Sequence, residues 1–150
     1  MSGTSSASAV RIRRHIAAEP ELVFAAWLDP IGMARWLSPV GHAEAHVEPW
    51  VGGRLQVTML GEGVRIEHTG EYRELIQGRR VVFTWRSPYT GPSASLVTVE
   101  LSAVPGGTEL TLVHEFLPAD QVESHTGGWG AILARLASEL TTPALEGQDR

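Results

Sequence analysis

The chain has 150 residues, of which 43% are hydrophobic and 19% charged, a balance typical of one globular domain with a substantial core. It contains no cysteine and no lysine, so disulfides, thiolate nucleophiles, Schiff bases and cysteine-ligated zinc are excluded. The net charge of −5 and the scattered arginines argue against nucleic-acid binding, and the absence of any run of ~20 apolar residues argues against membrane insertion.

The N-terminal part of the chain predicts a tail, one strand and two short helices. Residues 1–9 are small and polar without a signal-peptide pattern, so we expect a disordered tail on a cytoplasmic protein. Apolar and polar residues alternate over 10–16, as in a strand. Pro20 and the acids beside it favour a helix start, and Asp29 can cap a second short helix over residues 31–37.

The rest of the chain predicts six more strands and a long final helix. Turn residues separate strands at 42–47, 54–60, 64–75, 80–86, 93–103 and 108–116. The helix opens at residues 117–120 and runs toward Leu140, and its apolar face comprises Trp129, Ile132, Leu133, Leu136 and Leu140. Residues 141–150 are polar and contain a proline, so we expect a flexible tail there.

The predicted order of elements is β-α-α-β-β-β-β-β-β-α. A run of antiparallel strands followed by one amphipathic helix is typical of an α+β domain, here residues 10–140, in which a curved sheet wraps around the helix. We expect a continuous cavity between the sheet and the helix from His125 to Leu140, because a bent sheet cannot close tightly on a helix.

Six short motifs occur in the order and spacing of a known family. They are Trp36, Gly52-Gly53, Gly70-Glu71-Tyr72, Val82-Phe83-Thr84-Trp85, Gly107-Thr108-Glu109-Leu110 and His125-Thr126-Gly127-Gly128-Trp129. From about residue 10 to 140 the chain resembles the AHSA-type family, the relatives of the activator of the 90-kDa heat-shock protein ATPase, within the START-like (SRPBCC) superfamily. The resemblance implies the START-like helix-grip fold.

The resemblance leaves several functions open, because this superfamily includes lipid carriers, polyketide cyclases, sensors and chaperone co-factors on one scaffold. The sequence does not contain the additional N-terminal domain of the eukaryotic chaperone activators, which favours a free-standing, bacterial-style member. Family members are often homodimers, so we also expect a homodimer, in which the edge strands of the sheet are covered.

Strand alternation identifies the residues that face the predicted cavity. The row with Val81 is apolar, whereas the rows with Val99 and Leu110 also place Ser95 and His114 inward. The row that begins at Val64 and Ile66 places His68 and Tyr72 inward. The expected ligand-binding residues are Trp36, Trp50, His68, Tyr72, Phe83, Trp85, Ser95, Val97, His114, Phe116, Trp129 and Leu133. A mostly apolar wall with a few polar groups suits a small apolar or aromatic ligand.

Each of these residues also has an ordinary structural interpretation. An inward histidine is commonly a buried residue with satisfied hydrogen bonds, and we expect His114 to be buried with a pKa below its usual value. Trp27 and Trp129 lie in helical apolar stripes and fit core packing, whereas Trp36 and Trp50 lie near loops and fit the rim of a cavity.

Other chemistries find little support in the sequence. His42, Glu44, His46 and Glu48 share one face of a strand, but the opposite face is apolar, so we expect the histidines and acids to face solvent and to bind no metal. Ser95 and His114 lack the G-x-S-x-G context of a serine nucleophile. No glycine-rich phosphate-binding segment occurs, and we expect no cofactor.

Three functional hypotheses follow. The first is a binding protein for a small apolar or aromatic molecule. The alternative is a polyketide cyclase or dehydratase that uses His68 or His114 as a general acid or base. The second alternative is a chaperone ATPase co-factor, which would need a large surface that faces its partner.

Overall fold

The computed structural model describes residues 9–92 and 94–148, with side chains described as far as Thr141. Residues 1–8 and 149–150 of the expected tails, and Ser93, lie outside the described residues. The elements are β1 (Val10–Ile16), α2 (Pro20–Ala26), α3 (Pro30–Trp36), β2 (His42–Val47), β3 (Arg54–Gly61), β4 (Val64–Ile76), β5 (Arg80–Trp85), β6 (Ser95–Val104), β7 (Gly107–Glu115), the 3₁₀ helix η1 (Ala119–Gln121) and α4 (Val122–Gln148).

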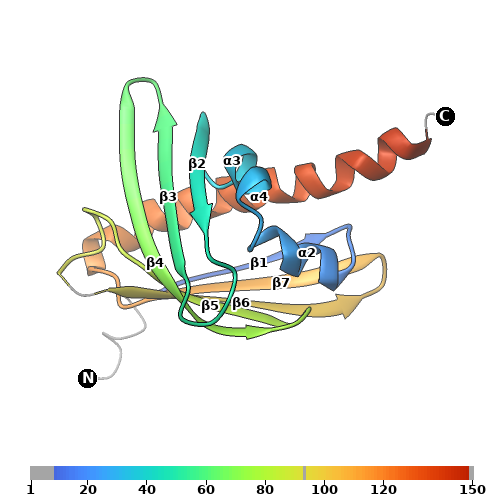
Figure 1. The fold of residues 1–150 in the computed structure, drawn as a ribbon, viewed down its shortest axis with the longest axis horizontal. Helices are drawn as coiled ribbons and strands as arrows, with labels where there is room; N and C mark the ends of the chain where they lie inside the picture. The colour runs from blue at the N-terminus through green and yellow to red at the C-terminus, as the bar shows by residue number, and fades with distance from the viewer. Residues whose placement is uncertain (1–8, 93, 149–150) are drawn as a thin grey trace.

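The strands form one seven-stranded antiparallel sheet in the order β1-β7-β6-β5-β4-β3-β2. In Figure 1, β2, β3 and the first part of β4 stand up from a layer made by β5, β6, β7 and β1, and α4 crosses the side toward which the sheet curves. This arrangement confirms the predicted α+β class and helix-grip fold.

The long strand β4 produces the bend between the two parts of the sheet. Its first half pairs with β3 and its second half with β5, and the register shifts between Tyr72 and Glu74. At Gly70 a Cβ atom would lie 1.9 Å from the carbonyl oxygen of Thr84, so only glycine allows the two strands to approach this closely. The bend separates the arm of β2, β3 and β4 from the rest of the sheet and leaves room beside α4.

The first short helix begins as the sequence predicts, and the second begins at Pro30, one residue before the predicted start. Pro20 is the first helical residue of α2, and Pro30 is that of α3. The Asp29 side chain accepts a hydrogen bond from the backbone N–H of Ile31 at 3.1 Å, which satisfies one of the free donors at the helix start. These helices therefore hold their buried aromatic side chains, Phe24 and Trp36, against the sheet.

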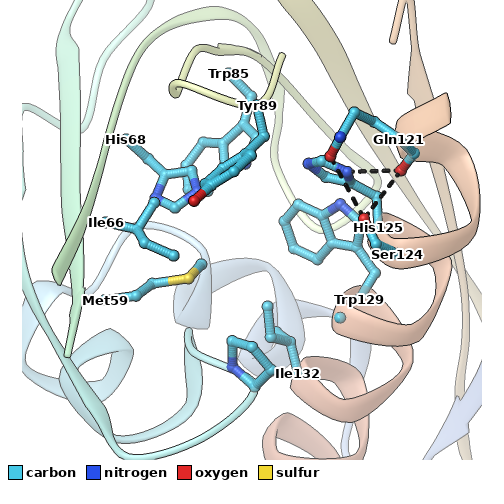
Figure 2. Close-up of a pocket in the computed structure, with 12 residues that line it drawn as sticks. Met59, Ile66, His68, Trp85, Tyr89, Gln121, Ser124, His125, Trp129 and Ile132 are labelled. Carbon is cyan, nitrogen blue, oxygen red and sulfur yellow. Dashed lines mark hydrogen bonds between the residues drawn. The ribbon is translucent and has the colours of Figure 1, made fainter. Parts of the chain in front are cut away.

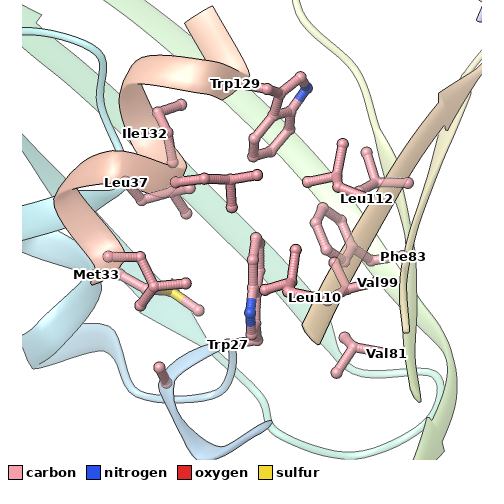
Figure 3. Packing of buried hydrophobic residues seen from close by; sticks show 14 of the residues in the cluster. Trp27, Met33, Leu37, Val81, Phe83, Val99, Leu110, Leu112, Trp129 and Ile132 are labelled. Atoms are coloured by element: carbon pink, nitrogen blue, oxygen red, sulfur yellow. The ribbon is translucent and has the colours of Figure 1, made fainter. Parts of the chain in front are cut away.

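The hydrophobic core surrounds Trp27, whose side chain is almost fully buried. Its ring packs edge-on against Trp36, with centroids 4.9 Å apart, and lies 6.1 Å from the ring of Phe83. The hydroxyl of Tyr72 donates to the carbonyl oxygen of Trp27 at 2.8 Å and so links the bend in β4 to the end of α2. Figure 3 shows Trp27 and Phe83 among the buried side chains that fill the space between helices and sheet.

The C-terminal helix covers the sheet with the predicted face. Trp129, Ile132, Leu133 and Leu136 are buried, and Leu140 is partly buried. Arg135 donates to the carbonyl oxygens of Ser38 and Gly41 at 2.5 and 2.7 Å, which ties the helix to the segment between α3 and β2. Among the described residues, no helix is both long and apolar enough to span a membrane.

Both predicted ends of this helix need correction. The segment at residues 117–120 does not open α4, because the chain first makes the 3₁₀ turn η1 and α4 begins at Val122. Nor does the helix end near Leu140, since it continues through Pro143 to Gln148. The prediction relied on Pro143 as a breaker, but a proline removes only one backbone donor, and a long helix can continue past it.

Candidate functional site

A cavity of about 370 Å³ lies between the arm of the sheet and the first turns of α4. This volume is within the roughly 300–1,000 Å³ that is usual for small-molecule sites. Figure 2 shows side chains from three sides pointing toward it. Its lining residues are Pro39, Met59, Ile66, His68, Trp85, Tyr89, Gln121, Ser124, His125, Gly128, Trp129 and Ile132.

The local structure explains why these side chains converge. Met59 of β3 and Ile66 of β4 are register partners, so their side chains lie beside each other on the same face of the arm. On α4, His125, Gly128 and Ile132 are spaced at three and four residues and share one helical face. Tyr89 is half exposed in the loop after β5, where it stands at the mouth of the cavity.

The cavity is shorter than the sequence predicts. It follows α4 from its start to Ile132, and does not continue to Leu140. Beyond Ile132 the space between helix and sheet is filled, because Leu133 and Leu136 pack fully buried against the same core as Trp27 and Trp36. Trp36 is the last residue of α3 and Trp27 directly follows α2, so these two short helices close the groove beyond Ile132.

Only three of the twelve expected ligand-binding residues line this cavity: His68, Trp85 and Trp129. Seven others are buried in the core or at its edge without lining it, namely Trp36, Tyr72, Phe83, Ser95, Val97, His114 and Leu133. Strand alternation correctly predicts that they point inward, but it does not distinguish residues that line a cavity from residues packed beneath its wall.

The remaining two expected residues, Trp50 and Phe116, do not face the interior. Trp50 lies in the turn before β3 and is 58% exposed, and so it is not part of the cavity rim. Phe116 is 64% exposed because β7 ends at Glu115 and Phe116 adopts a positive φ of 66°, which breaks the strand alternation. At the tip of the arm Val64 is also exposed, although alternation places it inward.

Several lining residues were not identified from the sequence. Ile132 was predicted on the apolar face of the helix but not as a ligand-binding residue. The same helical spacing would also have indicated His125 and Gly128, because they share one side of the helix with Trp129 and Ile132. The alternation through Leu55 and Val57 extends to Met59. Pro39, Tyr89, Gln121 and Ser124 lie in loops or at the helix start, where the sequence has no periodic signal.

His68 is the most buried polar group in the cavity wall. Its ring stacks on Trp85 with centroids 4.6 Å apart and planes inclined by 23°. Burial lowers the pKa of His68 to about 4, although nearby backbone groups of Val57 and Ile66 favour the protonated form. The imidazole is therefore neutral at physiological pH. Its Nδ1 atom is buried and has no hydrogen-bond partner among the described residues.

His114 lies behind this wall at the centre of a buried hydrogen-bond chain. The indole N–H of Trp129 donates to Nδ1 of His114 at 3.0 Å, and Nε2 lies 2.7 Å from the hydroxyl oxygen of Ser95. The Ser95 hydroxyl lies 2.5 Å from the carbonyl oxygen of Trp85, to which it donates. Burial is the main cause that lowers the pKa of His114 to about 3, as expected from the sequence.

The direction of these hydrogen bonds excludes Ser95 and His114 as a nucleophile and its base. An indole N–H can only donate, so Nδ1 of the neutral His114 is unprotonated and its proton is on Nε2. That Nε2–H donates to Ser95, whose own proton is directed to the backbone of Trp85. His114 therefore cannot accept the proton of Ser95, and the chain instead fixes the positions of Trp85 and Trp129, two walls of the cavity.

The histidines and acids of β2 face solvent, as predicted. His42, Glu44 and His46 are exposed, whereas Ala43 on the opposite face is buried. In the part of the chain that the structure describes, no group of three or more histidine and acidic side chains is arranged to hold a metal ion. The described lining of the cavity likewise contains no acidic or arginine side chain.

Comparison with known proteins finds relatives that match nearly the whole domain. The family model for activator of Hsp90 ATPase homolog 1-like proteins matches residues 17–141. Among solved structures, protein CV1439 from Chromobacterium violaceum is 29% identical, covering 88% of this chain and 96% of its own, with a TM-score of 0.78. The AHSA1 protein SPO3351 from Silicibacter pomeroyi is 27% identical, covering 90% and 99%, with a TM-score of 0.77. No curated protein is similar enough to the chain to count as a match.

Proposed function

Because the chain belongs to the family of activator of Hsp90 ATPase homolog 1-like proteins, we propose that it binds a small apolar or aromatic molecule in the cavity beside α4. The observation that carries this proposal is the chemistry of the wall. Trp85, Trp129 and Ile132 supply apolar surface, and His68 and His125 are the two imidazole side chains in the lining. Such a wall binds by burial of apolar area and orients the ligand by a few polar contacts.

The glycine at position 128 supports the same proposal. Gly128 lies within α4 and lines the cavity, and a Cβ atom there would meet no heavy atom within 4 Å. A glycine inside a helix costs about 1 kcal/mol relative to alanine, so it is unfavourable for the helix itself. We interpret Gly128 as the residue that keeps this wall thin and the cavity open.

The neighbouring Gly127 offers a matched control for an experiment on the cavity. It is also within α4 with nothing within 4 Å of its Cβ position, but it is exposed and does not line the cavity. Gly127→Leu and Gly128→Leu should therefore both stabilise the helix by ~0.5–1 kcal/mol. Only Gly128→Leu should place an isobutyl group in the cavity.

The proposal is tested by titrating the protein with the neutral fluorescent probe N-phenyl-1-naphthylamine. At about 0.3 kcal/mol per heavy atom, this probe should saturate one site with a Kd of roughly 0.2 mM or tighter. Binding should persist in Gly127→Leu and weaken at least about tenfold in Gly128→Leu. Equal binding by the two variants, or no saturable binding by the wild type, would reject the cavity as a binding site.

The enzyme alternative draws support from one observation. His68 and His125 both line the cavity, and a neutral imidazole can act as a general acid or base. A cyclase or dehydratase on this scaffold would use His68 in this way, whereas His114 is committed to its hydrogen-bond chain. Turnover of an added polyketide substrate that is lost in His68→Phe, with binding retained, would favour this alternative.

The proposal also includes assembly and location. β1 and β2 are the two ends of the sheet, and among the described residues no further strand covers their outer edges. Pairing of such an edge with a second copy supports a homodimer, which light scattering at micromolar concentration would test. We place the protein in the cytoplasm, which fractionation of the host cell would test.

A further inference from the structure

The orientation of His125 fixes which of its ring nitrogens can meet a ligand. Its Nδ1 lies 2.8 Å from the backbone carbonyl oxygen of Gln121, which can only accept a hydrogen bond. Nδ1 therefore carries the proton, and in the neutral imidazole Nε2 has a free lone pair. Figure 2 shows the ring between Gln121 and the cavity, with the second nitrogen on the cavity side.

The surroundings of His125 make this lone pair a selective contact. Ser124 lies within reach of the backbone carbonyl and the side-chain oxygen of Gln121, at 3.4 Å each, so hydroxyl and amide groups surround the start of α4. No acidic or arginine side chain belongs to the described lining. A charged ligand would thus lose its hydration without an opposite full charge in the wall, which is costly in an apolar site.

His68 faces the same cavity from the opposite wall. It is held by its stacking on Trp85 and cannot turn away without losing that contact. Its Nδ1 is buried out of reach of solvent and has no partner among the described residues, so this atom is not a contact for a ligand in the cavity. The cavity therefore presents two imidazoles, on β4 and on α4, separated by aromatic and aliphatic surface.

We infer that the ligand of this cavity is an uncharged aromatic molecule that carries an O–H or N–H group, and that His125 selects it by accepting this hydrogen bond at Nε2. The inference rests on the proposed function, because it specifies the ligand of the same cavity. Trp85 and Trp129 contact the aromatic part of such a ligand, and His68 lines the wall opposite His125.

Three naphthalene compounds test the inference, because they share the apolar ring and differ only in the substituent. 2-Naphthol has a hydroxyl donor, 2-methoxynaphthalene has none, and 2-naphthoate is charged. The wild type should bind 2-naphthol about tenfold more tightly than 2-methoxynaphthalene, since the ether leaves the imidazole acceptor unpaired. 2-Naphthoate should bind more weakly than 2-naphthol.

Two variants locate the source of this preference. His125→Phe keeps an aromatic ring but removes the acceptor, so it should bind both neutral compounds with similar affinity and leave the affinity for 2-methoxynaphthalene within about twofold of wild type. His46→Phe changes an exposed histidine of β2 and should retain the tenfold preference. Circular dichroism checks that both variants are folded.

A measurement on the wild type avoids dependence on the variants. The ¹⁵N resonance of Nε2 in His125 should shift when 2-naphthol is added, and should shift much less with 2-methoxynaphthalene. Equal affinity for the two neutral compounds, tighter binding of 2-naphthoate, or an unshifted Nε2 would overturn the inference while leaving the binding function intact. Failure of all three compounds to bind would reject the binding function and the inference together.

Discussion

The two buried histidines should make the stability of the fold depend on pH. Burial lowers the pKa of His114 to about 3 and that of His68 to about 4, whereas both side chains titrate near 6.5 when the chain is unfolded. Below pH 6.5 the unfolded chain therefore binds protons that the folded protein does not bind. Their contribution to stability is complete above pH 6.5 and is lost progressively as the pH falls toward 4 and then 3.

The expected loss is large for a domain of this size. Each histidine lowers the free energy of unfolding by up to about 1.4 kcal/mol for each pH unit below 6.5. At pH 5 the two residues together account for a loss of up to about 4 kcal/mol, against a usual total stability of about 5–15 kcal/mol. Both side chains are almost fully buried, so solvent screening reduces this value little.

Urea denaturation at pH 7 and pH 5 measures this effect. His114→Gln keeps groups that can accept from Trp129 and donate to Ser95 but cannot become charged in this range, so it should lose about half as much stability as wild type between the two pH values. His46→Gln, at an exposed position, should behave as wild type. Equal stability of the wild type at both pH values, or the same loss in His114→Gln, would show that the buried histidines do not cause the pH dependence.

Two further substitutions test other features of the fold by the same urea denaturation. Tyr72→Phe should cost ~1–2 kcal/mol because it removes the buried hydrogen bond to Trp27, whereas Tyr89→Phe, at a half-exposed side chain, should change stability by less than about 0.5 kcal/mol. Phe116→Gly should stabilise the protein by ~0.5–1 kcal/mol because glycine adopts the positive φ without strain, and Phe116→Ala should give no such gain. Loss of stability in Phe116→Gly would mean that the exposed ring makes a stabilising contact.

Local periodicity was enough to predict most of the architecture. The alternation through Val97 and Val99, and the helical spacing of Trp129, Ile132 and Leu136, correctly identify buried faces, because each signal depends only on neighbouring residues. Turn residues such as Gly52-Gly53 separate the strands, and the order of the elements predicts a sheet followed by a final helix. The fold was therefore accessible from the sequence.

The cavity depends on contacts between distant segments, and this explains what the sequence missed. His114 appears as an inward polar residue on β7, but its role is set by the indole of Trp129, which reaches it from α4. The extent of the cavity is set by Trp27 and Trp36, which belong to the core that fills the groove beyond Ile132. Phe116 adopts a left-handed backbone conformation although it is not a glycine. This conformation ends the strand alternation, and the sequence gives no indication of it.

Ligand binding in this cavity can be followed through the five tryptophan indole N–H signals in a ¹H–¹⁵N spectrum, recorded during titration with 2-naphthol. Trp85 and Trp129 line the cavity, whereas Trp50 is exposed elsewhere on the surface. Binding in the cavity should give saturable shifts of the Trp85 and Trp129 signals and leave the Trp50 signal unchanged. A shift confined to Trp50, or no saturable shift of Trp85 and Trp129, would contradict the claim that this cavity binds small aromatic molecules.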